Sequence, residues 1–206
     1  MIRTILALLL VSSVVLSQIP IPTPTALDLL NAHNAVRANP KSLVPVVQAY
    51  RNAFNAASSM ATPVGKPALT VLEGAQALDE AIAFLNAQAA VPPLTLNDKM
   101  TQAALLFAQD IGGRGVQSHI GADGSTLPVR LQRVGKVSAP GAENDAYGIP
   151  TAEWGIVAWI VDSNFPTRGH RVTIFNPDLK VVGFGCAPHK SAFGNCCVAD
   201  FAAAMV

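Results

Sequence analysis

Three short segments rich in glycine and turn residues carry the side chains that could do chemistry. His119 lies in QSHIGADGS, Glu143 in GAENDAYG and His170 in PTRGHRVTIFNP. Imidazoles and carboxylates are ligands of divalent metal ions and also act in general acid–base catalysis. Loop residues on a rigid scaffold often form functional sites. Isolated histidines are also common as surface groups or as satisfied core groups, so the residue types alone allow a joint site without establishing it.

The sequence lacks the motifs of several common enzyme classes. It contains no H-E-x-x-H, G-x-S-x-G, Walker or EF-hand pattern. The G-x-G run Gly183–Gly185 lies in a predicted strand with no helix after it, so it is not a dinucleotide fingerprint. The three cysteines, Cys186, Cys196 and Cys197, do not have the spacing of a zinc site.

The composition is that of a globular chain. Among 206 residues, 14 are Lys or Arg and 13 are Asp or Glu, which gives a net charge of +1. Only 13% of residues are charged and 50% are hydrophobic. This balance excludes a disordered polyelectrolyte, a coiled coil and a collagen-like repeat. The absence of a Lys/Arg block argues against nucleic acid as a partner.

The first residues have the pattern of a secretory signal peptide. Arg3 precedes an uncharged apolar run, and Val15 and Ser17 are placed as a small-residue cleavage site. The run is too short to span a membrane. We therefore predict a signal peptide over residues 1–17, a Pro-rich linker over 18–25, and a secreted protein with no membrane span. An oxidising compartment favours a disulfide bond.

Helices come first in the predicted order and strands come late. Helical periodicity and capping signals predict six helical segments, over residues 26–38, 43–60, 70–91, 97–113, 125–134 and 151–162. The third is assigned a capping box, Thr70 to Glu73. Two apolar runs, 180–187 and 196–203, predict an antiparallel hairpin. This order is typical of an α+β fold.

The segments with candidate site residues also carry a family resemblance. SHIGADGSTLPVR, GAENDAYG and RGHRVTIFNPDLKVVGFG, in that order, resemble the signature segments of the CAP superfamily, also called the SCP domain. LNAHNAVRANP resembles the opening helix of that family. The resemblance covers residues 26–203 and implies one domain with a three-layer α-β-α sandwich and a small antiparallel sheet.

The resemblance also implies a cleft with two histidines and two acids. By motif these fall on His119, Glu143, Asp162 and His170. Family members usually have Glu where this chain has Asp162, and a helix-end carboxylate near Arg168 or Arg171 is an equally weighted interpretation of that residue. The expected metal ligands are His119 and His170, with Glu143 as a further candidate, for Zn²⁺ or another divalent metal. No cofactor is required by the resemblance.

Other polar and aromatic residues have plainer interpretations. His33 and Arg37, four residues apart on one helix, predict a buried structural cluster, and His189 is expected to be solvated. Asp123 is expected to shape its turn. Three aromatic residues are expected in the core or the cleft wall: Tyr147, Trp154 and Trp159. The segment 44–90 is expected to pack as an extra helical layer, with a lipid-receiving surface as the alternative.

Which two cysteines pair follows in part from the resemblance. Phe184 and Phe201 should both face the core, which places Cys186 and Cys197 on one side of the hairpin. The strand register of the family sets those two cysteines opposite each other. A one-residue slip would instead pair Cys186 with Cys196. The remaining cysteine is then free or available to a second chain.

The family has no uniform activity, so three functions stay open. The first is an extracellular binding or effector module with a metal-capable cleft. The second is a metal-dependent hydrolase, in which Zn²⁺ on His119 and His170 would activate water with Glu143 as the base. The third is a sterol or lipid carrier. The expected partner is an unidentified extracellular molecule or a lipid, and we expect a monomer, with a dimer through the free cysteine as the alternative.

Overall fold

The structure is a computed structural model that describes residues 23–206. The predicted signal peptide over residues 1–17 lies outside the described residues, as does the linker up to residue 22. Within the described residues, no helix combines the length and the apolar character needed to cross a bilayer.

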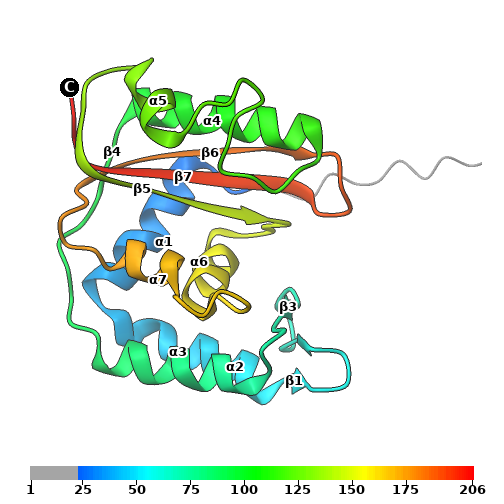
Figure 1. The fold of residues 1–206 in the computed structure, drawn as a ribbon. Coiled ribbons are helices and arrows are strands. Elements are labelled where there is room, and N and C mark those ends of the chain that lie inside the picture. The colour runs from blue at the N-terminus through cyan, green and yellow to red at the C-terminus, as the bar shows by residue number, and fades with distance from the viewer. Residues whose placement is uncertain (1–22) are drawn as a thin grey trace, which may run out of the picture.

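A four-stranded sheet forms the centre of the fold (Figure 1). Its strands lie in the order β4 (Thr95–Leu96), β6 (Val181–His189), β7 (Gly194–Met205) and β5 (Val137–Tyr147). β6 and β7 form the predicted hairpin, β5 pairs antiparallel to β7, and β4 adds a short parallel edge to β6. The late hairpin was predicted from local pattern, whereas β5 was not predicted as a strand.

Helices cover both faces of this sheet, which confirms the predicted α-β-α sandwich (Figure 1). α4 (Asp98–Arg114) and α5 (Leu127–Gln132) lie on one face. The other face carries three helices: α1 (Ala26–Ala38), α6 (Ala152–Val161) and α7 (Gly169–Ile174).

Beyond α6 and α7, the chain builds a further helical layer (Figure 1). It contains the 3₁₀ helix η1 (Pro40–Leu43), α2 (Val44–Asn52) and α3 (Ala75–Ala87). The prediction of one helix over residues 43–60 was wrong, because the chain leaves α2 after Asn52. It then forms a small meander of β1 (Phe54–Asn55), β2 (Met60–Ala61) and β3 (Leu69–Thr70).

Local capping signals predicted some helix starts well and others badly. The Asn97 side chain accepts a hydrogen bond from the Met100 amide, and the Thr151 side chain accepts one from Trp154, as predicted. The capping box was wrong, because Thr70 lies in β3 and α3 begins only after Gly74, whose φ of 81° favours glycine.

Two further helix boundaries also differ from the prediction. Thr126, not Ser125, precedes the first turn of α5. α4 continues beyond Gly113 to Arg114, and a left-handed Gly115 ends it.

Buried polar residues of α1 lie beside the core. The ring of His33 packs against Trp159, Phe184 and Phe201, and its Nδ1 lies 2.7 Å from the carbonyl oxygen of Leu29. Burial lowers the pKa of His33 to about 4, so its ring is neutral at pH 7. Arg37 is fully buried and donates to four backbone carbonyls: those of Pro92, Ile174, Asn176 and Leu179. These contacts confirm the predicted structural cluster.

The G-x-G run of β6 has a packing role. A Cβ atom on Gly183 would collide with the backbone of Met100 and Thr101, and one on Gly185 would collide with that of Leu105. The missing side chains therefore let α4 lie directly on the sheet.

The disulfide bond joins Cys186 to Cys197, as the resemblance implied. The two residues are direct partners in the β6–β7 ladder, with Phe184 opposite Ala199. Cys196 points to the other face of the sheet, where it is buried and its Sγ donates to the carbonyl oxygen of Ala108 at 3.3 Å. That burial keeps the free thiol away from the surface that a second chain could reach.

Candidate functional site

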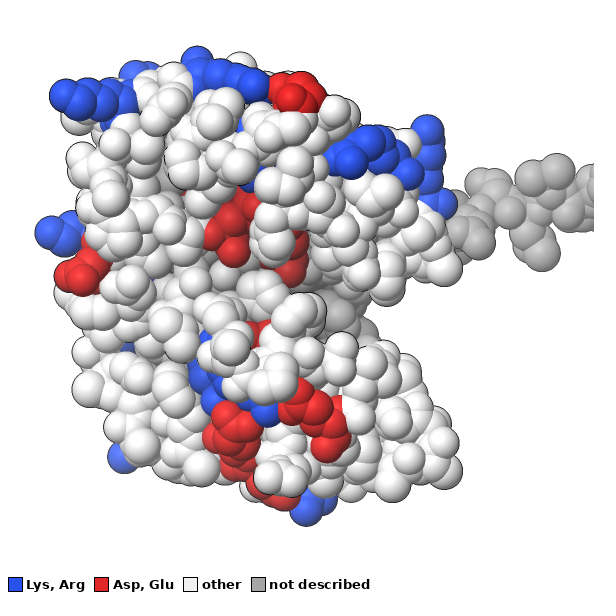
Figure 2. Space-filling model, in the orientation of Figure 1, with Lys and Arg blue, Asp and Glu red and all other residues white. Residues whose placement is uncertain are grey.

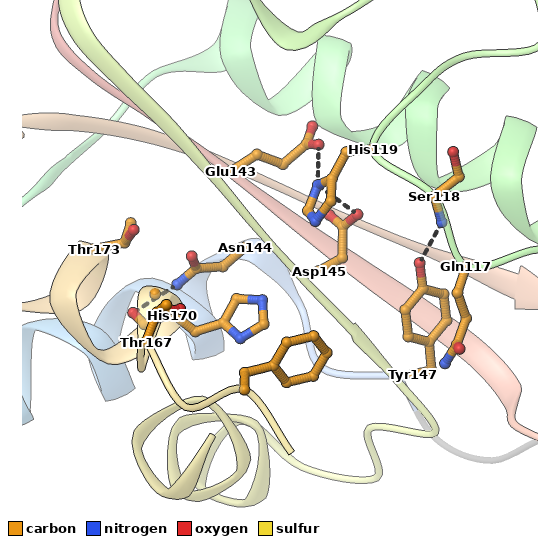
Figure 3. Close-up of a pocket in the computed structure, with 12 residues that line it drawn as sticks. Gln117, Ser118, His119, Glu143, Asn144, Asp145, Tyr147, Thr167, His170 and Thr173 are labelled. Atoms are coloured by element: carbon orange, nitrogen blue, oxygen red, sulfur yellow. Dashed lines mark hydrogen bonds and ion pairs between the residues drawn. The ribbon is translucent and has the colours of Figure 1, made fainter. Parts of the chain in front are cut away.

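The candidate site residues come from three elements that meet at one cavity of about 510 Å³ (Figure 3). His119 lies in the loop after α4, Glu143 lies on β5, and His170 lies on α7. Glu143 was expected in a loop, but it is a strand residue paired with Asp200 of β7. Figure 2 shows acidic side chains gathered in the hollow across the middle of this face.

His119 and Glu143 form the best-defined pair of the cavity. The Nδ1 atom of His119 lies 2.7 Å from Glu143 Oε1 and 3.3 Å from Asp145 Oδ2. The other oxygen of Glu143 accepts a hydrogen bond from Arg130 Nη2. Arg130 also donates to the carbonyl oxygens of His119 and Ser125, at 3.1 and 3.0 Å. One buried guanidinium therefore holds both the strand and the histidine loop.

Asp145 is a site residue that the sequence reasoning missed. It is 8% exposed, and neither carboxylate oxygen has a hydrogen-bond partner among the described residues, although Oδ2 lies at ion-pair distance, 3.3 Å, from the His119 ring. One ligand atom each from His119, Glu143 and Asp145 lie within 4.8 Å of one another, which is close enough for a shared metal ion. Residues 143 and 145 share a face because side chains alternate along a strand, so recognising β5 would have found Asp145.

The charges around His119 shift the pKa values of several groups. The hydrogen bond to Glu143 raises the pKa of His119 above 6.5, opposed by burial and helped by the charge of Asp145. Burial, and then repulsion from Glu143, raise the pKa of Asp145 well above 3.8. The same two causes raise the pKa of the fully buried Asp200. The cluster therefore contains three acidic groups, Glu143, Asp145 and Asp200, but only the guanidinium of Arg130 to balance their charge.

His170 and Asp162 form a second histidine–acid pair across the cavity. The Nδ1 of His170 lies 2.7 Å from Asp162 Oδ1, and its backbone amide donates to Oδ2 at 3.0 Å. Asp162 is 3% exposed and does not line this cavity, although it lines the adjoining hollow of about 580 Å³. Both predicted histidines therefore line one cavity, whereas Asp162 orients a ring. The alternative of a helix-end carboxylate also describes it, because it is the C-cap of α6.

The remaining candidates lie elsewhere. His189 was expected to be solvated, but it is buried, with Ser191 and the Val116 carbonyl at its two ring nitrogens. The strand β6 extends further than predicted and carries it inward. Asp123 accepts from the Ser125 amide at 3.0 Å and shapes its turn, as predicted.

A second hollow of about 580 Å³ continues from the first and shares five of its lining residues: Gln117, Asp145, Tyr147, Phe165 and His170. Tyr147 and Trp154 line its wall, and Trp159, which is 2% exposed and packed in the core, also borders it. The Trp159 Nε1 donates to the Asp145 carbonyl at 3.0 Å, which ties the core to the site strand.

Comparison with known proteins gives a family and likenesses to several solved structures. The family model described as "Cysteine-rich secretory protein family", CAP, matches residues 30–201. No curated protein matches the chain.

The first likeness among solved structures is to an extracellular protein containing an SCP domain from Bacillus anthracis. Its identity is 20% and its TM-score 0.46, and the alignment covers 62% of this chain and 39% of that one. An outer surface protein from Borrelia burgdorferi gives the same identity and TM-score, with 54% and 78% covered. A cysteine-rich secretory protein from Staphylococcus aureus is 14% identical, with a TM-score of 0.39 and 68% and 43% covered.

The chain therefore spans about two fifths of the length of two of these three proteins. The family match, by contrast, extends over most of the chain, from within α1 to the last part of β7, and it includes every residue of the cavity and the disulfide bond. The chain belongs to the CAP family of cysteine-rich secretory proteins.

Proposed function

We propose that this protein is an extracellular binding module whose cleft holds a divalent metal ion. The ligand set would be His119, Glu143 and Asp145. The observation that carries the proposal is the carboxylate of Asp145, which is buried without a hydrogen-bond partner beside two other ligand groups. A buried carboxylate without hydrogen bonds is costly unless a cation or a proton compensates it.

The chemistry of these donors fits the metal. One imidazole nitrogen and two carboxylates suit Zn²⁺, and carboxylates also suit harder divalent cations. A bound ion of this kind would polarise a carbonyl oxygen of the ligand or a water molecule bound beside it. The side chain of His119 is 58% exposed, so ions and ligands can reach it from solvent.

Neighbouring residues would prepare the site. Arg130 holds one oxygen of Glu143 and leaves the other facing His119. Asp162 fixes the ring of His170 on the opposite wall, where it would contact a ligand or complete the metal site. Protons and metal compete for His119, and the raised pKa of the ring favours the proton in that competition.

Secretion is the other part of the proposal. The predicted signal peptide supports it, as does the Cys186–Cys197 disulfide, since such bonds persist in oxidising compartments.

Calorimetric titration of chelator-treated protein with Zn²⁺ and with Ca²⁺ tests the metal site. We expect saturable binding to the wild type and at least about tenfold weaker binding after His119→Ala or Asp145→Asn, since each removes a ligand. Asp98→Asn changes an exposed acid at the start of α4 and serves as the matched control. The His170→Ala variant separates a second histidine ligand from a ligand-facing wall residue. Absence of binding to the wild type, or equal affinities in all variants, would overturn the proposal.

A further inference from the structure

The connection from α6 to α7 contains three non-glycine residues in left-handed conformations. These are Asp162 (φ 49°), Asn164 (φ 74°) and Arg168 (φ 52°), within seven residues of one another. Such conformations cost free energy and persist only where surrounding contacts impose them. Their concentration next to His170 indicates that this connection is held in shape for the cavity.

The contacts that hold it come from the further helical layer. Glu73, just before α3, accepts from the Asn164 amide at 2.9 Å and from Arg168 Nη2 at 2.5 Å. Its own amide donates to Ser163 Oγ at 3.2 Å. Glu80 of α3 accepts from Arg168 Nη2 at 2.7 Å. The carboxylates of Glu73 and Glu80, both from the further helical layer, therefore bind the guanidinium of Arg168 in the connection.

On its other side, Arg168 reaches the histidine pair. Its Nη1 donates to the Asp162 carbonyl oxygen at 2.7 Å, and the Asp162 carboxylate in turn holds both the ring and the amide of His170. Arg171, the residue after His170, donates to Glu80 Oε1 at 2.8 Å and to the Ile160 carbonyl at 2.6 Å. His170 is therefore bracketed by two arginines that share Glu80.

We infer that Arg168 is a positioning residue for His170: anchored by Glu73 and Glu80, it fixes the connection whose Asp162 aligns the imidazole in the cavity. The inference deepens the proposed function and rests on it for the role of His170 in the cleft. It also gives the further helical layer a part in the site. An isolated surface ion pair would contribute little, but the Arg168 side chain is only 12% exposed and joins three segments.

The test reads the tautomer of His170 by long-range ¹⁵N–¹H NMR in metal-free protein. Asp162 accepts from Nδ1, so the neutral wild-type ring carries its proton there. In Arg168→Ala and in Glu73→Ala we expect the ratio of the Nδ1–H to the Nε2–H form to fall by about tenfold, the factor for one lost hydrogen bond. The spectrum of His119 should stay unchanged.

Arg51→Ala is the matched control, because it breaks an exposed ion pair from α2 to Asp79 of the same α3 without touching the connection. An unchanged His170 tautomer in Arg168→Ala would overturn the inference, as would equal changes at His119 and His189. If Arg168→Ala fails to fold, Glu73→Ala decides, since it removes a partly exposed side chain. The readout needs no metal, so a wild type that binds no Zn²⁺ would overturn only the proposed function.

Discussion

At the residue scale, the central feature of the cleft is one imidazole that lies within ion-pair distance of two carboxylates. His119 sits between Glu143 and Asp145, while Arg130 takes the remaining oxygen of Glu143. The protonated ring is the cation that this arrangement favours in the absence of a metal. The contribution of His119 to the free energy of unfolding should therefore depend on pH.

The folded protein should lose the contribution of His119 as the pH rises. A histidine whose pKa is raised by folding stabilises the fold fully below its unfolded value of about 6.5, and that contribution disappears as the pH passes through the folded pKa. His119→Gln should therefore cost more stability at pH 5.5 than at pH 8.5. Urea denaturation of both proteins at the two pH values, with chelator present, measures this.

The wild type must be compared with the His119→Gln variant because His33 changes stability with pH in the opposite direction. Its lowered pKa makes the fold less stable in acid, since the unfolded chain binds a proton that the buried ring refuses. Subtracting the variant from the wild type removes the term from His33. A difference that is the same at both pH values would contradict the prediction for His119.

At the element scale, α4 lies on β6 because glycines remove the side chains between them. Gly185→Ala should cost roughly 2–4 kcal/mol, since its Cβ would collide with the backbone of Leu105 and no rotamer can relieve that contact. Gly113→Ala, in α4 itself but facing open space, should instead stabilise by about 0.5–1 kcal/mol. Thermal denaturation of the two variants measures this difference. Similar melting temperatures for both would contradict the prediction that α4 needs a glycine at position 185 to pack on β6.

The β6–β7 hairpin separates the two adjacent cysteines by face. Cys197→Ser removes a bridge that closes a short loop, worth roughly 2–3 kcal/mol, and should lower the melting temperature by roughly 5–10 °C. Cys196→Ser should cost less, because a hydroxyl can still donate to the Ala108 carbonyl.

Alkylation supplies an independent check of the same assignment. Burial raises the pKa of Cys196 to about 11, so the native thiol should resist iodoacetamide at pH 8 and react once the chain is unfolded. A larger effect of Cys196→Ser on melting, or rapid labelling of native protein, would refute it.

Local signals account for what the sequence could predict. Asn97 and Thr151 cap helices because a cap depends only on the next three residues. Thr70 offered the same signal, but pairing with Met60 placed it in a strand. Glu143 lies in a strand because β7, more than fifty residues later, pairs with it. The family motif supplied Glu143 without that strand, whereas Asp145 needed it, and so Asp145 was missed.

At the scale of the whole molecule, the sandwich and its further helical layer converge on one cavity. The sheet supplies Glu143 and Asp145, one face of helices supplies the His119 loop, and the other supplies His170. The further layer reaches the site through Glu73 and Glu80. The further helical layer is therefore linked to the site by the contacts of Glu73 and Glu80 with Arg168.

The fate of the whole chain is a prediction that depends on residues outside the described part. Amino-terminal sequencing of protein recovered from culture medium should begin at or near Gln18, because Val15 and Ser17 form the predicted cleavage site. Uncleaved protein in the membrane fraction would contradict this.

The strand order has a consequence for biosynthesis. β7 lies between β6 and β5, yet it follows both of them in the chain, so neither can pair with β7 until residues 194–205 have left the ribosome. A nascent chain therefore carries open edges on β5 and β6 until β7 has emerged. Ribosome-bound chains stalled before Gly194 should be cut by protease throughout the sheet, and protection of β5 at that stage would show that the sheet forms earlier.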